Sequence, residues 1–331
     1  MLPPAGPVVE RGYSRFVFPF GQRLMTGVSN LVPFALFDLL IVAVVGGVMV
    51  FTWRDVRRRR RSGWPRLSAR AALRVAVAAS AAYLAFLVCW GLNYRREPLI
   101  ARTTYDPALI TLDGAKQLGA YAVRRANALH AGAHDETPIP LHDVDPRLAR
   151  AFADAQPAFA APRPIVVARP KKTLLDLYFR RAGVAGMTDP YFLETLIASD
   201  LLPFERPMVI AHEWAHLAGL GDEGEANFAG FLACLRGSAL HQYSAWLSLY
   251  TDVYNGLPEA DARDLGRTLD PGPRADLQAV RERLLRQISP TVSAAGWRVY
   301  DQYLKANRVD AGTASYSEIV RLVLGTRAVD Y

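Results

Sequence analysis

Two long apolar segments near the start of the chain constrain its fold more than any other feature. They read PFALFDLLIVAVVGGVMVFTW (33–53) and AALRVAVAASAAYLAFLVCWGL (71–92), each about the 20 residues that a helix needs to cross a bilayer. They also account for a hydrophobic content of 51%. A cleaved signal peptide would end in small residues, whereas the first segment runs into RDVRRRR. The sequence therefore predicts two transmembrane helices within residues 33–95.

The connection between these segments, residues 54–74, carries nine arginines and a single acid, Asp55. By the positive-inside rule this connection is a cytoplasmic loop. We therefore expect a multi-pass protein of the inner (plasma) membrane, with its N-terminus and everything after residue 95 on the extracytoplasmic side. Residues 1–32 mix Pro, Gly, aromatic residues and Arg, which favours an extracytoplasmic segment lying on the lipid headgroups.

The net charge of +8 is unevenly distributed, and this excludes one class of partner. Residues 1–100 hold 14 Lys and Arg against 4 Asp and Glu, which leaves 25 and 27 for residues 101–331. The larger part of the chain is thus close to neutral. A nucleic-acid partner, which would need a basic surface there, is not expected.

The remainder of the chain, residues 96–331, predicts one extracytoplasmic domain of the α+β class that is mainly helical. The β-branched and alternating segments PIVVAR (164–169) and YFLETLIASDLL (191–202) predict strands. From residue 207 onward the apolar pattern is helical, interrupted by Gly and Pro.

The stretch VIAHEWAHLAG (209–219) carries the clearest chemical signal. Pro207 suits the first turn of a helix and Gly219 suits the left-handed residue after its end, so we expect a helix over 207–218. Its buried stripe would be formed by residues at i, i+4 and i+7, namely Ile210, Trp214 and Leu217.

His212 and His216 are four residues apart and therefore share one face of that helix. Two imidazoles so placed can bind one Zn²⁺ ion, which makes Zn²⁺ the expected cofactor. Glu213, next to the first histidine, is then the expected general base that takes a proton from a zinc-activated water.

Three acids in GLGDEGEANF compete to be the third metal ligand. Asp222 has the spacing at which metzincin enzymes place theirs. Asp222 and Glu225 also form the D-x-x-E pattern of a helix cap, so both have a structural role available. Glu223 has none, which favours it as the ligand, with Asp222 and Glu225 as alternatives.

This set of residues resembles the gluzincin arrangement, in which His-Glu-x-x-His is followed by Glu-x-x-x-Asp. The matching residues here are His212, Glu213, His216, Glu223 and Asn227. The resemblance implies that Glu223 is the third ligand and that Asn227 holds a ligand imidazole through its other nitrogen. Asn227 replaces the usual Asp, which keeps the hydrogen bond but removes a charge.

A resemblance that covers most of the chain is to an uncharacterised family of bacterial membrane proteins regarded as zinc metallopeptidases. The matching segments are WGLNYRREPL, HEWAHLAGLGDEGEANFAGFLAC, QYSAWL and ASYSEIVRLVL. It implies two N-terminal transmembrane helices followed by a zincin-like metallopeptidase domain, and it implies no particular substrate.

Two further features fit a peptidase. The strand expected within 191–202 precedes the motif helix, where zincin folds keep an edge strand that binds substrate backbone. His241 or Tyr243 in LHQYSAW would reach the developing oxyanion. A second histidine pair, His130 and His134, is also four apart, but it runs into a turn-rich loop and we expect a solvated helix end there.

The sequence thus predicts a membrane-anchored zinc metallopeptidase that hydrolyses peptide bonds, with Glu213 as general base. Its expected partners are a peptide or protein substrate and the lipid bilayer. The alternative is a non-catalytic, zinc-stabilised binding or scaffold module of the cell envelope.

Overall fold

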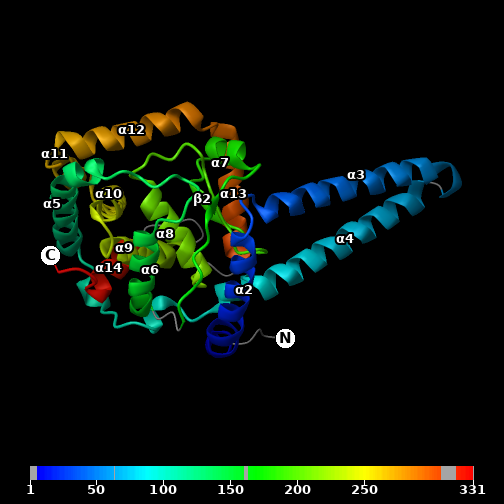
Figure 1. Cartoon of the computed structure of the whole chain (residues 1–331), viewed down its shortest axis with the longest axis horizontal. Helices are drawn as coiled ribbons and strands as arrows, with labels where there is room; N and C mark the ends of the chain where they lie inside the picture. Colours follow the sequence, from blue (N-terminus) through cyan, green and yellow to red (C-terminus); the bar gives the residue numbers. More distant parts are fainter. Residues whose placement is uncertain (1–5, 63, 160–162, 307–317, 331) are drawn as a thin grey trace.

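The computed structural model of the chain describes residues 6–62, 64–159, 163–306 and 318–330. Over these residues the protein is mainly helical with little sheet (Figure 1). The first half contains α1 (Gly6–Val8), η1 (Val9–Val17), α2 (Phe18–Asn30), α3 (Leu36–Ser62), α4 (Trp64–Cys89), η2 (Gly91–Arg95), η3 (Leu99–Ala101), η4 (Pro107–Leu109), α5 (Leu112–Asp135), α6 (Pro146–Ala155) and η5 (Gln156–Phe159). The second half contains β1 (Pro170–Lys171), α7 (Asp176–Ala182), β2 (Gly186–Thr188), β3 (Thr195–Ile197), α8 (Arg206–Leu217), α9 (Glu223–Leu235), α10 (Ala239–Gly256), α11 (Glu259–Arg267), α12 (Pro271–Gln287), α13 (Pro290–Ala306) and α14 (Glu318–Thr326).

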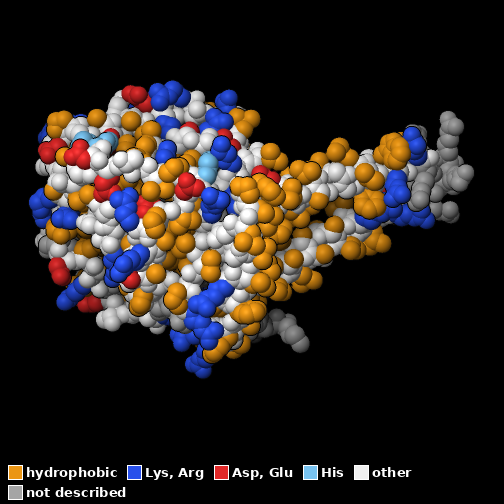
Figure 2. All heavy atoms as spheres, viewed as in Figure 1, with side chains coloured by type: hydrophobic (Ala, Val, Ile, Leu, Met, Phe, Trp, Pro, Cys, Tyr) orange, Lys and Arg blue, Asp and Glu red, His pale blue; other side chains and the backbone are white. Residues whose placement is uncertain are grey.

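Helices α3 and α4 form a hairpin that projects away from the rest of the molecule (Figure 1). Each contains 22 residues long and apolar enough to cross a membrane, Leu36–Arg57 and Ser68–Cys89, and almost none of that surface is buried. Figure 2 shows apolar side chains along the hairpin and Lys and Arg side chains near its tip. The connection expected to be a loop is largely helical, because α3 continues to Ser62 and α4 begins at Trp64.

Helix α2 is amphipathic, but its polar face packs against the protein and its apolar face is exposed. Its polar side chains face the protein: Gln22 exchanges hydrogen bonds with the backbone of Val166, and the Thr26 hydroxyl donates to the carbonyl of Leu193 at 2.9 Å. Its apolar side chains continue a stripe from η1 and are exposed, at a spacing of four residues: Phe16, Phe20, Leu24 and Val28. The segment expected on the lipid headgroups is therefore also packed onto the domain through its polar face.

A buried ion pair joins the base of the hairpin to the domain. Lys171 donates to Glu194 at 2.7 Å, and both side chains are almost fully buried. Glu194 also accepts from the Ser29 hydroxyl at 3.0 Å and from the backbone N–H groups of Leu36 and Phe37, at 3.0 and 2.9 Å, which open α3. The carboxylate thus satisfies donors that a helix start leaves unpaired, and it fixes where the hairpin leaves the domain.

The sheet is small and has the order β1-β3-β2, with β1 parallel and β2 antiparallel to β3. The prediction of a strand within 191–202 is confirmed by β3, but β3 is central, so its predicted role as an edge strand was wrong. The prediction of a strand over 164–169 was also wrong. Backbone groups of that segment bind side chains of α2 instead, including Asn30, whose amide donates to the Val167 carbonyl.

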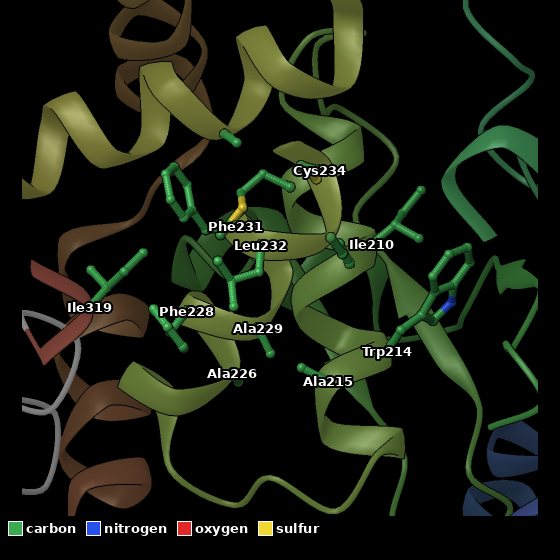
Figure 3. Close-up of a cluster of buried hydrophobic side chains, with 14 of the residues drawn as sticks. Ile210, Trp214, Ala215, Ala226, Phe228, Ala229, Phe231, Leu232, Cys234 and Ile319 are labelled. Atoms are coloured by element: carbon green, nitrogen blue, oxygen red, sulfur yellow. The ribbon is translucent and has the colours of Figure 1, made fainter. Parts of the chain in front are cut away.

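The core that positions the motif helix is formed by α8, α9, α10 and α14. Figure 3 shows its close-packed side chains, among them Trp214 of α8, Phe228 and Phe231 of α9, and Ile319 of α14. Helices α8 and α9 approach closely through small residues on both. A Cβ at Gly230 would lie 2.9 Å from the backbone nitrogen of His212, so only glycine lets α9 cross α8 at the motif.

Candidate metal centre

Helix α8 forms as its sequence predicts. It spans Arg206–Leu217 with Pro207 in its first turn, and Gly219 follows it with φ +80°, the left-handed conformation that glycine favours. The predicted stripe of Ile210, Trp214 and Leu217 is buried. The remaining face carries both motif histidines toward α9.

Helix α9 supplies the partners of those histidines. Asp222 precedes the helix, and its side chain accepts from the backbone N–H of Glu225 at 3.0 Å, as a helix cap does. Glu223 is the first residue of the helix and Asn227 lies one turn later on the same side. The close crossing at Gly230 brings both side chains to the imidazoles.

Three potential ligand atoms converge between the two helices. The Nε2 atoms of His212 and His216 are 3.1 Å apart, and Oε2 of Glu223 lies 3.2 Å from the first and 3.6 Å from the second. Zinc bonds of about 2.0 Å to ligands at tetrahedral corners place neighbouring ligand atoms roughly 3.3 Å apart. The three separations bracket that value.

The tautomers of the two histidines follow from their outer nitrogens. Nδ1 of His216 lies 2.7 Å from the carbonyl oxygen of Leu220, and Nδ1 of His212 lies 2.8 Å from Oδ1 of Asn227. Both partners are acceptors, so both Nδ1 atoms carry a proton, and in the neutral rings both Nε2 atoms present lone pairs. Two lone pairs and a carboxylate at these distances would repel each other, and either a proton on an imidazole or a metal cation between them removes that repulsion. The residues therefore fit a bound zinc ion.

The pKa shifts in the metal-free cluster also indicate that the site favours a positive charge. Burial lowers the pKa of His216, but the charge and hydrogen bond of Glu223 outweigh it and raise this pKa to about 9. Burial acts in the opposite sense on Glu223, where the two imidazoles outweigh it and hold the pKa of the carboxyl well below its usual range. The site thus favours an ionised carboxylate with a positive charge beside it.

The two alternative ligands point elsewhere. The carboxylate of Asp222 caps α9. Glu225 turns away from the histidines, accepts a hydrogen bond from the backbone of Leu99, and lies 3.8 Å from Arg102. Its pKa is raised to about 7, chiefly by burial. Of the three acids, only Glu223 reaches both imidazoles.

Glu213 is buried on the side of α8 that faces the sheet. The Thr188 hydroxyl of β2 lies 2.9 Å from both the backbone carbonyl and Oε2 of Glu213. Burial raises the pKa of Glu213, with the neighbouring histidines acting against it. A carboxyl group with a raised pKa is suited to exchanging protons near neutral pH.

His241 and Tyr243 of α10 have partners outside this cluster. Nδ1 of His241 accepts from the backbone N–H of Ser238 at the start of α10, and its Nε2 lies 3.1 Å from Asp145. The Tyr243 hydroxyl donates to Asp276 of α12. Since neither side chain is among the groups that the structure brings to His212, we assign neither to the site.

Two residues of this region carried no signal that we interpreted in the sequence. Thr188 reaches Glu213 from a three-residue strand 25 positions earlier. Trp90 follows the second apolar helix, and its indole N–H donates to the carbonyl of His216 at 2.9 Å. A tryptophan directly after an apolar span is an interface signal, yet here it also connects α4 to α8, which carries the two motif histidines.

The fold and the site define a mainly helical chain with two membrane-length apolar helices and a buried cluster of two histidines and a carboxylate. A protein-family model, described as Protein of unknown function (DUF3810), matches residues 13–324. The chain belongs to this family. No curated protein and no solved structure matches it.

Proposed function

We propose that the protein is a membrane-anchored zinc metallopeptidase with a zincin-like domain. The observation that carries the proposal is the convergence of three lone-pair donors, from His212, His216 and Glu223, beside the buried carboxyl of Glu213. A scaffold needs only the ligands. A hydrolase also needs a group that exchanges protons with the attacking water, and the carboxyl group of Glu213, whose pKa is raised, is suited to that role.

When bound, a zinc ion supplies Lewis-acid chemistry, which lowers the pKa of water and polarises a carbonyl. Glu213 then takes a proton from the attacking water at its carboxylate and passes it to the amine that leaves. Thr188 keeps this carboxylate in place through its hydroxyl. Asn227 holds the ring of His212 so that Nε2 stays unprotonated.

The substrate would bind along β2, the strand next to Glu213. The N–H of Asp189 donates to Glu194, and the N–H of Ala198 donates to Ala185, so the odd-numbered positions of this strand pair with β3. The backbone groups of Gly186 and Thr188 therefore point to the opposite edge. An extended peptide that pairs there would lie beside the cluster, in the role that the sequence had assigned to 191–202.

The membrane placement rests on two surfaces. The exposed hairpin is long enough to span a bilayer twice, with the Arg-rich tip in the cytoplasm and the domain in the periplasm or outside the cell. Helix α2 lies at the base of the hairpin (Figure 1), and the exposed apolar stripe of η1 and α2 would lie in the headgroup region. The cluster would then lie close to the membrane surface, since Trp90 links it to the end of α4.

Replacement of Glu213 by Gln tests the hypothesis that the protein is a peptidase with Glu213 as its general base. The variant keeps the shape of the side chain, so it should retain the tightly bound zinc while turnover falls by about 10²-fold or more. Purified full-length protein in detergent would be incubated with a tryptic digest of cell-envelope protein, and new cleavage products identified by mass spectrometry. Glu282→Gln, a carboxyl group on α12, is the matched control and should cleave like the wild type.

Undiminished cleavage by Glu213→Gln would remove Glu213 from the mechanism. A wild-type protein that binds zinc tightly and cleaves nothing would favour the non-catalytic envelope module instead.

A further inference from the structure

A second cluster of metal-ligand side chains lies between α5 and α12. His130 and His134 are one turn apart on α5, with ring centroids separated by 4.4 Å. Asp276 of α12 faces both, and its Oδ2 lies 3.5 Å from Nε2 of His130 and 2.8 Å from Nε2 of His134. The potential ligand atoms of the three residues all lie within 4.8 Å of one another.

Two neighbours shape this cluster. Tyr243 of α10 donates its hydroxyl proton to Oδ2 of Asp276, and its ring lies edge-on to both imidazoles. A Cβ at Gly272 would lie only 2.5 Å from the ring of His130. A larger residue at position 272 would therefore displace that imidazole from its present position. Three helices, α5, α10 and α12, meet at the carboxylate.

We propose that His130, His134 and Asp276 form a second divalent-metal site that takes Zn²⁺. Two imidazoles and one carboxylate are a ligand set that zinc accepts, with solvent at the remaining corner. The separations to Asp276, 2.8 and 3.5 Å, again bracket the roughly 3.3 Å expected between ligands of a tetrahedral ion. This site is independent of the peptidase proposal, because it shares no residue with the first cluster.

The second ion would bind more weakly than the first and would act as a brace. The side chains of His130 and His134 are 28% and 44% exposed, so each must be ordered when the ion binds. Once bound, the ion would clamp α12 to α5. Farther along α12, Arg283 forms ion pairs with Asp200 and Glu205, which precede α8. The bound ion would therefore hold α12 in place, and α12 in turn contacts the residues just before α8.

Metal stoichiometry tests the proposal. Metal-stripped, full-length protein in detergent would be dialysed to equilibrium against increasing concentrations of Zn²⁺, and the bound metal measured. The wild type should bind two ions per chain, one tightly and one at least tenfold more weakly. His134→Ala should bind only the tight ion. Asp276→Asn, which still accepts the hydrogen bond of Tyr243, should behave in the same way.

The controls separate this site from the first cluster and from adventitious binding. Asp135→Asn removes the exposed acid next to His134 and should still bind two ions. Glu223→Gln should lose the tight ion and keep the weaker one. A wild type that binds a single ion, or a His134→Ala protein that binds as many as Asp135→Asn, would show that the three side chains form only a hydrogen-bonded network.

Discussion

The two histidine clusters are built from the same parts in different surroundings. Each has two histidines four residues apart on one helix and a carboxylate from another helix. In the first cluster the three side chains are 14%, 10% and 3% exposed, and in the second they are 28%, 44% and 11% exposed. The outer nitrogens also differ. Those of His212 and His216 each have a hydrogen-bond acceptor, whereas over the described residues we find no such bond for His130 or His134.

If both clusters bind metal, this difference separates a preorganised site from one that must be ordered by the ion. Fixed tautomers and buried rings mean that the first cluster gives up little conformational freedom when an ion binds. The second cluster has the ligand types without that support. Affinity should therefore follow the surroundings of the ligands rather than their identity, and the following predictions test that ordering.

The largest effect is expected from His216→Ala. It removes one of three ligands and leaves Glu223 as a buried carboxylate with less compensation. The affinity for the tight zinc ion should fall by more than about 100-fold, as the loss of a direct ligand must exceed the 10- to 100-fold effect of losing a supporting residue. Competition with a chromogenic chelator would measure it. His142→Ala, which removes a histidine outside both clusters, should match the wild type.

A smaller effect is expected from Asn227→Ala, which leaves all three ligands in place. Without the amide oxygen, His212 loses the contact that orients its ring, so the affinity should fall by about 10- to 100-fold. Asn227→Asp keeps the contact and adds a charge, and it should bind at least as tightly as the wild type. Equal affinities for wild type and Asn227→Ala would mean that helix packing alone orients the ring. Asn127→Ala, on α5, is the matched control.

The first cluster could be predicted from the sequence because its determinants are local. A proline, a glycine and a spacing of four residues define α8 and the face that carries its two histidines. Glu223, the expected third ligand, lies only seven residues after His216. The choice of Glu223 over Asp222 and Glu225 followed from the cap pattern, and the structure gives Asp222 that capping contact.

The second cluster could not be predicted, since its carboxylate lies 142 positions after His134. Only the packing of α12 on α5 brings Asp276 there, and no periodicity in the sequence encodes that contact. The same limit applies to the sheet. Strand β3 was visible from its composition, but its central position depends on β1 and β2, which are two and three residues long.

The third prediction is that the Tm depends on pH in the metal-free protein but not in the zinc-bound protein. In the metal-free protein the pKa of His216 is raised to about 9, against an ordinary value of 6.5. Its contribution to stability is complete below pH 6.5 and is lost as the pH rises through 9. The Tm of stripped protein should therefore fall by a few degrees between pH 6.5 and 9. Zinc-loaded protein should show no such fall, because ligand imidazoles are already neutral. Identical profiles with and without zinc would contradict this account.

The smallest effect is expected from Tyr243→Phe, which distinguishes a structural from a catalytic tyrosine. Its hydroxyl binds Asp276 in the second cluster, so its loss should cost about 1 kcal/mol of stability, measured as a slightly lower Tm, and leave cleavage unchanged. If Tyr243 instead stabilised an oxyanion, turnover would fall by about 10²-fold or more at constant Tm. Measuring both quantities on one preparation decides between the roles. A loss of turnover would also mean that the reaction depends on the second cluster, and the contrast between the two clusters would no longer hold.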